Sequence, residues 1–150
     1  MLMVVFIRKR RKIPVRASDI MITEVVTVKP DDPVTRAAKL MVENLIGSVL
    51  VVDDEGRLRG IVTERDIVYV VSEAWDPTKH RVWEIMTENP IVVRPDDDLL
   101  TVVRKMSETN VRHLPVVDEK GAPVGIISFR DVLDFLMSVL GLALGMALER

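Results

Sequence analysis

Two short segments carry the residue types best suited to binding chemistry, and they share one pattern. Each has a glycine that enters a predicted strand, then two aliphatic residues, a hydroxyl residue, and an aspartate three positions further on. The segments are Gly60-Ile61-Val62-Thr63-Glu64-Arg65-Asp66 and Gly125-Ile126-Ile127-Ser128-Phe129-Arg130-Asp131. A hydroxyl followed by a carboxylate at this spacing is typical of a capping box, in which both groups satisfy amides at the start of a helix.

The same groups also suit a nucleotide. Free amides at a helix N-terminus favour an anion such as phosphate. A carboxylate beside them can accept hydrogen bonds from ribose hydroxyls, as the acidic residue does in dinucleotide-binding folds. Both segments keep an arginine directly before the aspartate, which capping does not require. The pattern therefore leaves two interpretations open, a helix cap and a nucleotide site.

The elements that must position these segments also occur twice. Residues 20–68 reappear as residues 85–133, shifted by 65 positions without a gap. An internal repeat predicts two like units, and halves of about 60 residues are marginal alone. They should pack face to face, with any site at their seam occurring twice about a pseudo-two-fold axis. The recurring residues include Met21/Met86, Pro30/Pro95, Asp31/Asp96, Asp32/Asp97, Met41/Met106, Gly56/Gly121, Gly60/Gly125, Arg65/Arg130 and Asp66/Asp131.

Each unit is predicted to be β-α-β-β-α, which makes the fold class α/β. In the first unit we expect strands at 25–28, 48–52 and 58–62. A helix should follow the first strand, with Asp32 as its N-cap and Pro33 at its first position, and a second helix should cover 63–74. In the second unit we expect strands at 91–94, 114–117 and 124–127, with helices from about Asp98 and from Ser128. Short helical turns are expected at 15–21 and 81–86. The residues expected on the buried faces of the long helices are Val34, Ala37, Ala38, Met41 and Leu45, and Leu99, Val102, Val103 and Met106.

With these repeated motifs, residues 15–135 resemble a tandem pair of cystathionine-β-synthase-type (CBS) domains. The resemblance implies a disc-like module of two CBS repeats that binds adenosine-containing ligands such as AMP, ADP, ATP or S-adenosylmethionine in clefts between the repeats. It also implies a module that commonly dimerises and regulates an attached or partner protein. The domain organisation we expect is a basic arm at 1–14, repeats at 15–75 and 76–135, and an apolar C-terminal helix extension at 136–150.

The resemblance also assigns site residues, with the two aspartates holding ribose hydroxyls and Thr63 and Ser128 near phosphate or ribose. One cleft is expected to use Thr23, Val25, Ile46, Gly47, Arg112, His113, Ser128, Arg130 and Asp131. The other is expected to use Thr63, Arg65, Asp66, Thr87, Pro90, Ile91 and Val111. The family often has basic residues at the start of the middle strand to meet phosphate. Arg112 and His113 stand there in the second unit, whereas Gly47 and Ser48 do in the first. We therefore expect the Asp131 cleft to be the better phosphate site and the Asp66 cleft to suit a less charged ligand.

Several other classes of protein are disfavoured. The chain has no cysteine, and neither of its two histidines has a carboxylate at ligand spacing, so we expect no disulfide and no metal site. The acidic run 96–98 is interpreted as a helix cap. No Ser-His-Asp set, P-loop or Rossmann glycine pattern is present, so we expect no catalysis and no required cofactor. A net charge of −2 argues against a general nucleic-acid binder.

The amino-acid composition and the N- and C-terminal segments lead to further expectations. Few amides, no thiols and 29% charged residues suggest a thermophile, and a cytoplasmic location is expected. The basic run 8–12 follows an apolar start, which is the wrong order for a secretory signal. This arm is expected to be an extra strand or a solvated tail, with contact to an acidic partner, nucleic acid or lipid as the alternative. The apolar run 135–148 is too short to span a bilayer. It is expected to form a homodimer or partner interface, with intramolecular packing and membrane association as alternatives.

We therefore expect a non-catalytic sensor or regulatory module that binds an adenine nucleotide or S-adenosylmethionine. The alternatives are a structural or dimerisation module whose motifs only cap helices, and a nucleic-acid-associated protein that binds through the arm.

Overall fold

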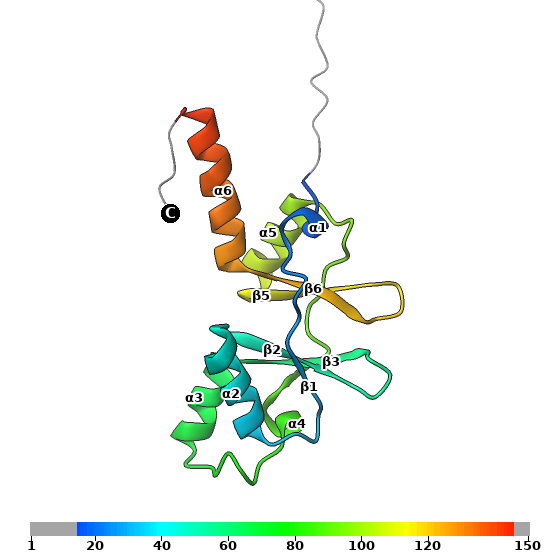
Figure 1. The fold of residues 1–150 in the computed structure, drawn as a ribbon, viewed down its shortest axis with the longest axis vertical. Coiled ribbons are helices and arrows are strands. Elements are labelled where there is room, and N and C mark those ends of the chain that lie inside the picture. The colour runs from blue at the N-terminus through cyan, green and yellow to red at the C-terminus, as the bar shows by residue number, and fades with distance from the viewer. Residues whose placement is uncertain (1–14, 146–150) are drawn as a thin grey trace, which may run out of the picture.

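The computed structural model describes residues 15–145. The predicted basic arm and the last five residues of the predicted extension lie outside the described residues. The chain forms four layers, with two β-sheets facing each other and helices covering their outer faces (Figure 1). This arrangement confirms the predicted α/β class, with each repeat contributing most of one sheet and of its covering helices.

Three strands of the first repeat and one strand of the second form a four-stranded sheet in the order β1-β2-β3-β4. The strands are β1 (Thr27–Val28), β2 (Ser48–Val52), β3 (Leu58–Thr63) and β4 (Thr87–Glu88), and the helices of the first repeat are α2 (Val34–Asn44) and α3 (Glu64–Ser72). β1 runs parallel to β2, while β2 and β3 form an antiparallel hairpin. All five residues of β2 are buried because α2 covers one face of this strand and the other sheet lies across its second face.

The second repeat copies this plan with α5 (Leu99–Thr109), β5 (His113–Val117), β6 (Pro123–Ser128) and α6 (Phe129–Ala143). The two hairpins have the same register, shifted by 65 residues, and both have an irregularity before the last residue of the first strand. The predicted strand at 91–94 is reduced to a single parallel bridge between Val93 and Val116, the counterpart of the β1–β2 pairing. The predicted pseudo-two-fold relation of the repeats is therefore confirmed, with one sheet more complete than the other.

The segment that leads into each repeat packs against the opposite repeat. The short helix α4 (Val82–Ile85) adds Val82 and Ile85 to the core beneath the first sheet, whereas α1 (Ala17–Ile20) adds Ala17 to the core of the second. β4 follows α4 and pairs with β3, and Ile22 forms the equivalent bridge to Ile126. The two repeats thus exchange their lead-in segments, so each core contains residues from both.

Two glycines allow this exchange. A Cβ on Gly60 would lie 2.7 Å from Met86 Sδ and 2.9 Å from the Thr87 carbonyl oxygen. A Cβ on Gly125 would lie 2.6 Å from Met21 Sδ. Both distances are below ordinary contact, so only glycine lets the lead-in of the other repeat lie this close to the strand.

Three predictions about the helices are wrong in detail. Asp32 is not the N-cap of α2, because its Oδ2 accepts a hydrogen bond from the Lys29 amide at 2.8 Å. Pro33 holds the cap position instead, and the amide of Val34 donates to the carbonyl of His80 in the connector at 3.0 Å. Leu45 is not inward but 92% exposed, because it ends α2 in the left-handed conformation with φ 53°. Val103 is likewise exposed.

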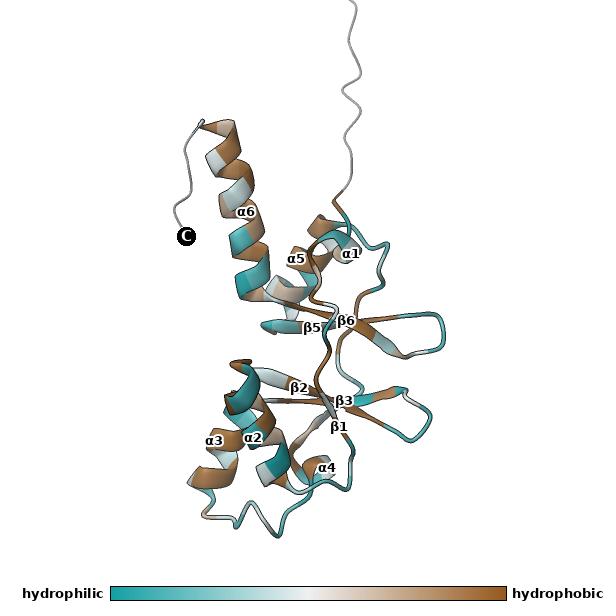
Figure 2. Ribbon diagram, in the orientation of Figure 1, coloured by the Kyte–Doolittle hydropathy of each residue, from teal (hydrophilic) through white to brown (hydrophobic). Residues whose placement is uncertain are grey.

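Helix α6 extends well beyond the body of the second repeat (Figure 1). Apolar residues recur along its whole length, and polar residues are confined mainly to its first half (Figure 2). In residues 15–145 no helix combines the length and the apolar character that crossing a membrane requires.

Candidate functional site

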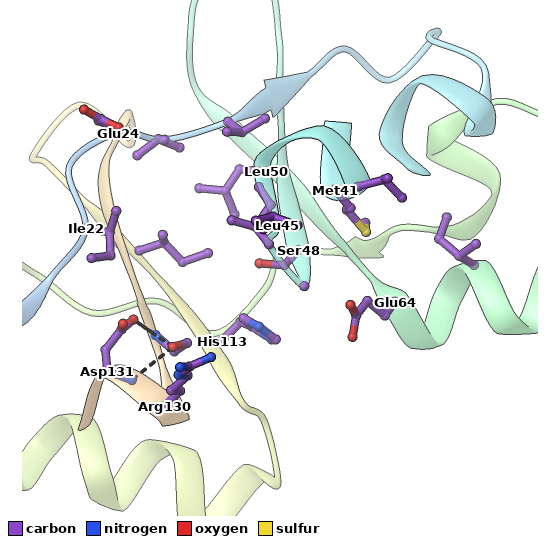
Figure 3. Close-up of a pocket in the computed structure, with 18 of the residues that line it drawn as sticks. Ile22, Glu24, Met41, Leu45, Ser48, Leu50, Glu64, His113, Arg130 and Asp131 are labelled. Carbon is purple, nitrogen blue, oxygen red and sulfur yellow. Dashed lines mark hydrogen bonds between the residues drawn. The ribbon is translucent and has the colours of Figure 1, made fainter. Parts of the chain in front are cut away.

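A cleft with a volume of ≈ 1040 Å³ lies between the two repeats. Its floor and one wall come from α2, β2 and the start of α3, and the opposite wall comes from β5, β6 and the start of α6 (Figure 3). This volume is at the upper end of the range of small-molecule pockets in proteins. We call it the Asp131 cleft.

The structure brings together most of the residues predicted for this cleft. The predicted residues that line it are Val25, Ile46, Gly47, His113, Ser128, Arg130 and Asp131. Thr23 does not line it, although Ile22, Glu24 and Val25 of the same segment do. Arg112 does not line it either. The side chain of Arg112 borders a smaller cavity of ≈ 460 Å³ between α5 and α6, together with Val111 and Phe129.

The hydroxyl and carboxylate of the second motif form the predicted capping box. Asp131 Oδ2 accepts hydrogen bonds from the Ser128 amide at 2.7 Å and from the Ser128 hydroxyl at 2.8 Å, and the Asp131 amide donates to Ser128 Oγ at 3.1 Å. Asp131 Oδ1 accepts no hydrogen bond from the described residues. The two interpretations of the motif are therefore compatible, because one carboxylate oxygen caps α6 and the other is available at the cleft wall.

The amides at the start of α6 are less available than the sequence suggested. The Phe129 amide donates to the Arg112 carbonyl at 2.8 Å, and the Asp131 amide is taken by Ser128. Of the three amides in the first turn, these two already have acceptors, so the expectation of a free anion-binding helix end is wrong for them. The first repeat has the counterpart of the bond between Phe129 and Arg112. At the start of α3, the Glu64 amide donates to the Gly47 carbonyl at 3.1 Å.

His113 reaches across the seam toward the first repeat. Its Nε2 lies 3.3 Å from the point that a Cβ on Gly47 would occupy, and the Glu64 carboxyl carbon lies 3.6 Å from the same point. Burial lowers the pKa of His113 below its usual value, although the nearby Glu64 and Asp131 carboxylates oppose this shift. The imidazole is therefore neutral at pH 7 and lies among carboxylates.

Two acidic residues in the lining were missed by the sequence prediction. Glu24 and Glu64 both border the cleft, on opposite sides of it (Figure 3). Glu64 lies inside the first motif, directly after Thr63, and that position was a signal that could have been used. Phe129 holds the equivalent place in the second repeat, so the repeat comparison hides the difference in charge.

The residues predicted for the second cleft are not brought together around a comparable space. Asp66 makes the same cap, accepting from the Thr63 amide at 2.8 Å and from its hydroxyl at 3.3 Å, and burial raises its pKa despite these bonds. Neither of the two cavities described is lined by Thr63, Arg65, Asp66, Thr87, Pro90 or Ile91. Arg112 occupies the position in the second repeat that Gly47 occupies in the first, and it lines the smaller cavity between α5 and α6.

The expectation that neither histidine has a carboxylate at ligand spacing is wrong for His80, whose Nδ1 lies 3.1 Å from Glu84 Oε1. No group of three or more histidine, aspartate or glutamate side chains within residues 15–145 is arranged to hold a metal ion.

Comparison with known proteins agrees with this geometry. The family model for the CBS domain matches residues 17–73 and again residues 82–138. An uncharacterized 17.7 kDa protein from the bps2 3′ region of Acidianus ambivalens is 36% identical over 124 residues, which are 83% of this chain and 74% of that protein. An inosine-5′-monophosphate dehydrogenase from Methanocaldococcus jannaschii is 35% identical over 118 residues, but the chain spans only 23% of its length.

Solved structures give the same relationship. The CBS domain pair of protein MJ0100, in complex with 5′-methylthioadenosine and S-adenosyl-L-methionine, matches with a TM-score of 0.76 and 29% identity over 83% of this chain and 98% of that one. The structure of CBSX2 in complex with AMP matches with a TM-score of 0.74 and 30% identity over the same shares. With a family match on both repeats and the exchanged lead-in segments that join them, the chain belongs to the CBS domain family as a tandem pair.

Proposed function

We propose that this chain binds an adenosine-containing small molecule in the Asp131 cleft and acts as a non-catalytic regulatory module. One observation carries the proposal. On the side of the second repeat, the cleft has the Asp131 carboxylate, of which one oxygen caps α6 and the other accepts no hydrogen bond from the described residues. On the side of the first repeat, the cleft has an apolar wall. The complexes of MJ0100 with 5′-methylthioadenosine and S-adenosyl-L-methionine, and of CBSX2 with AMP, support adenosine as the common part of the ligand.

The lining suggests how such a ligand would be held. Val25 and Ile46 provide apolar surface from the first repeat for an adenine ring, and Asp131 Oδ1 provides an acceptor for a ribose hydroxyl. A ligand in this position contacts both repeats at once. It changes their relative orientation only to the extent that it binds one arrangement better than another, and that difference is what a regulated partner protein would sense.

Thermal unfolding with and without ligand tests the proposal. A ligand that binds only the folded state stabilises it by about 2.7 kcal/mol at a concentration one hundred times its Kd. Adenosine ligands should therefore raise the melting temperature, and ribose 5-phosphate at the same concentration is the control. If no adenosine ligand raises the melting temperature, the proposal is wrong, and a structural module whose motifs only cap helices becomes the favoured function.

We also propose that a second copy of the chain covers α6. The exposed fractions of Leu136, Met137, Val139, Leu140 and Leu142 range from 45% to 83%. Burial of such side chains stabilises an interface by roughly 25 cal/mol for each Å² of apolar surface removed from water. The helix projects from the body of the second repeat, so it can pack against a partner without disturbing the cleft (Figure 1).

A further inference from the structure

The charges around the Asp131 cleft are unbalanced. Its lining contains three carboxylates, Glu24, Glu64 and Asp131, and one guanidinium, that of Arg130. With His113 neutral, the formal charge of the lining is −2. Neither Glu24 nor Glu64 makes an ion pair within residues 15–145, so their charges are not compensated by neighbours there.

The groups that could receive a phosphate are weak or engaged. The Arg130 side chain is 88% exposed and lies 3.9 Å from Asp134 on its own helix, so it is not held in place facing the cleft. Arg112 borders the other cavity. Two of the first three amides of α6 already donate to protein acceptors. The cleft thus lacks the preorganised donors and cations that phosphate recognition commonly uses.

The charges of the two glutamates act on any charged group of a ligand that is bound in this cleft. They lie on opposite sides of the cleft, with the Asp131 carboxylate and its free oxygen on a third side (Figure 3). A phosphomonoester carries about −1.5 to −2 charges at pH 7 and would be repelled by both. A thioether carries no charge. S-adenosylmethionine has a net positive charge, because its sulfonium and ammonium together outweigh its single carboxylate, and would be attracted.

We propose that the Asp131 cleft selects adenosine ligands whose 5′ substituent is neutral or positively charged over adenosine phosphates. This inference rests on the proposed function, because it names the ligand class of the same cleft. It reverses the sequence-based expectation that this cleft is the better phosphate site, and it makes Glu24 and Glu64 the residues that set the specificity.

Isothermal titration of the wild-type chain with four ligands measures the selectivity. 5′-Methylthioadenosine and AMP share adenine and ribose and differ in the charge at the 5′ position. We expect 5′-methylthioadenosine to bind at least about tenfold more tightly than AMP. ATP should bind more weakly than AMP, and S-adenosylmethionine should bind at least as tightly as 5′-methylthioadenosine. Raising the salt concentration should narrow these differences, because salt screens charges at an open cleft.

Neutralising one glutamate at a time assigns the effect to this cleft. Glu64→Gln and Glu24→Gln should each strengthen AMP binding and weaken S-adenosylmethionine binding by roughly threefold to tenfold. The affinity for 5′-methylthioadenosine should change less, because that ligand carries no charge at the 5′ position. The matched control is Glu108→Gln on α5, which removes the same charge away from the cleft lining and should change none of the affinities.

The outcomes separate this inference from the proposed function. AMP or ATP binding more tightly than 5′-methylthioadenosine, or affinities that do not respond to Glu24 and Glu64, would overturn the inference and leave an adenosine-binding module. Absence of binding by all four ligands would overturn the proposed function and the inference together.

Discussion

His113 of β5 lies against Gly47 of the other repeat, with Nε2 only 3.3 Å from the position of a Cβ on that glycine. The absence of a side chain at residue 47 therefore gives the imidazole its place in the seam and leaves the Asp131 cleft open. The related position in the second repeat is Arg112, and no described cavity surrounds Asp66. We infer that the glycine at position 47 contributes to the openness of the Asp131 cleft, because its second-repeat counterpart carries a long side chain.

We predict that Gly47→Arg closes the Asp131 cleft. The new side chain must displace His113 or fill the space beside Glu64, so the affinity for an adenosine ligand should fall at least about tenfold, equivalent to 1.4 kcal/mol. Calorimetric titration measures the loss. The reciprocal substitution Arg112→Gly is the control, because Arg112 does not line this cleft, and an equal loss of affinity in that variant would contradict the explanation.

We predict that the stability of the ligand-free chain depends on His113 below pH 6.5. Burial holds the pKa of His113 below the usual value of 6.5, so the unfolded chain binds more protons as the pH falls through this region. The contribution of His113 to stability is complete above pH 6.5 and is lost as the pH falls through its folded-state pKa. Glu64 and Asp131 oppose this shift and Arg112 supports it.

Urea unfolding at pH 7.5 and at pH 5 tests this dependence. The wild-type chain should lose more free energy of unfolding on acidification than His113→Gln, which has no group to protonate at this position. Identical losses in the two proteins would show that His113 keeps its ordinary pKa in the seam.

We predict that the exchanged lead-in segments make Gly60 and Gly125 sensitive to any side chain. Alanine at either position overpacks the contact with a methionine of the other repeat and should destabilise the fold by about 1–3 kcal/mol. Gly60→Ala should cost more than Gly125→Ala, because the Thr87 carbonyl oxygen lies 2.9 Å from the new Cβ, whereas Ile22 O lies 3.1 Å away in the second case. Chemical denaturation measures both values, and a neutral effect of both variants would contradict the close packing.

We predict that removing the end of α6 weakens self-association. Truncation after Ser138, or Leu140→Glu in the full chain, should lower the mass measured by light scattering at micromolar concentration. Leu100→Glu on α5 is the control, because Leu100 is also exposed but lies on a different helix. An unchanged mass in both α6 variants would show that a second copy does not cover this helix.

Sequence periodicity and the internal repeat predicted the two hairpins, the long helices and both capping boxes, because these features depend on residues close together in the chain. The contacts between the two repeats were harder to predict from the sequence. Whether Arg112 faces the Asp131 cleft depends on the direction of its side chain in the connection between α5 and β5, and the spacing of residues does not determine that direction. The exchange of α1 and α4 between the two cores also depends on long-range packing.

The errors in local structure have the same origin. Asp32 was expected to cap α2, but the carbonyls of the connector, distant in sequence, satisfy the first amides of this helix. Leu45 continues the apolar spacing of α2, yet the helix ends there and its side chain is exposed. Glu64 was overlooked because a charged residue at the start of a helix is usually explained by favourable interaction with the helix dipole.

The two capping boxes allow the most direct test of the proposed site. Asp131→Ala and Asp66→Ala each remove one capping carboxylate and should lower stability by similar amounts, about 1 kcal/mol. Only Asp131 lines the open cleft. Calorimetric titration with 5′-methylthioadenosine should therefore show at least a tenfold loss of affinity in Asp131→Ala and wild-type affinity in Asp66→Ala. Undiminished binding by Asp131→Ala, or an equal loss in both variants, would contradict the assignment of the ligand to the Asp131 cleft.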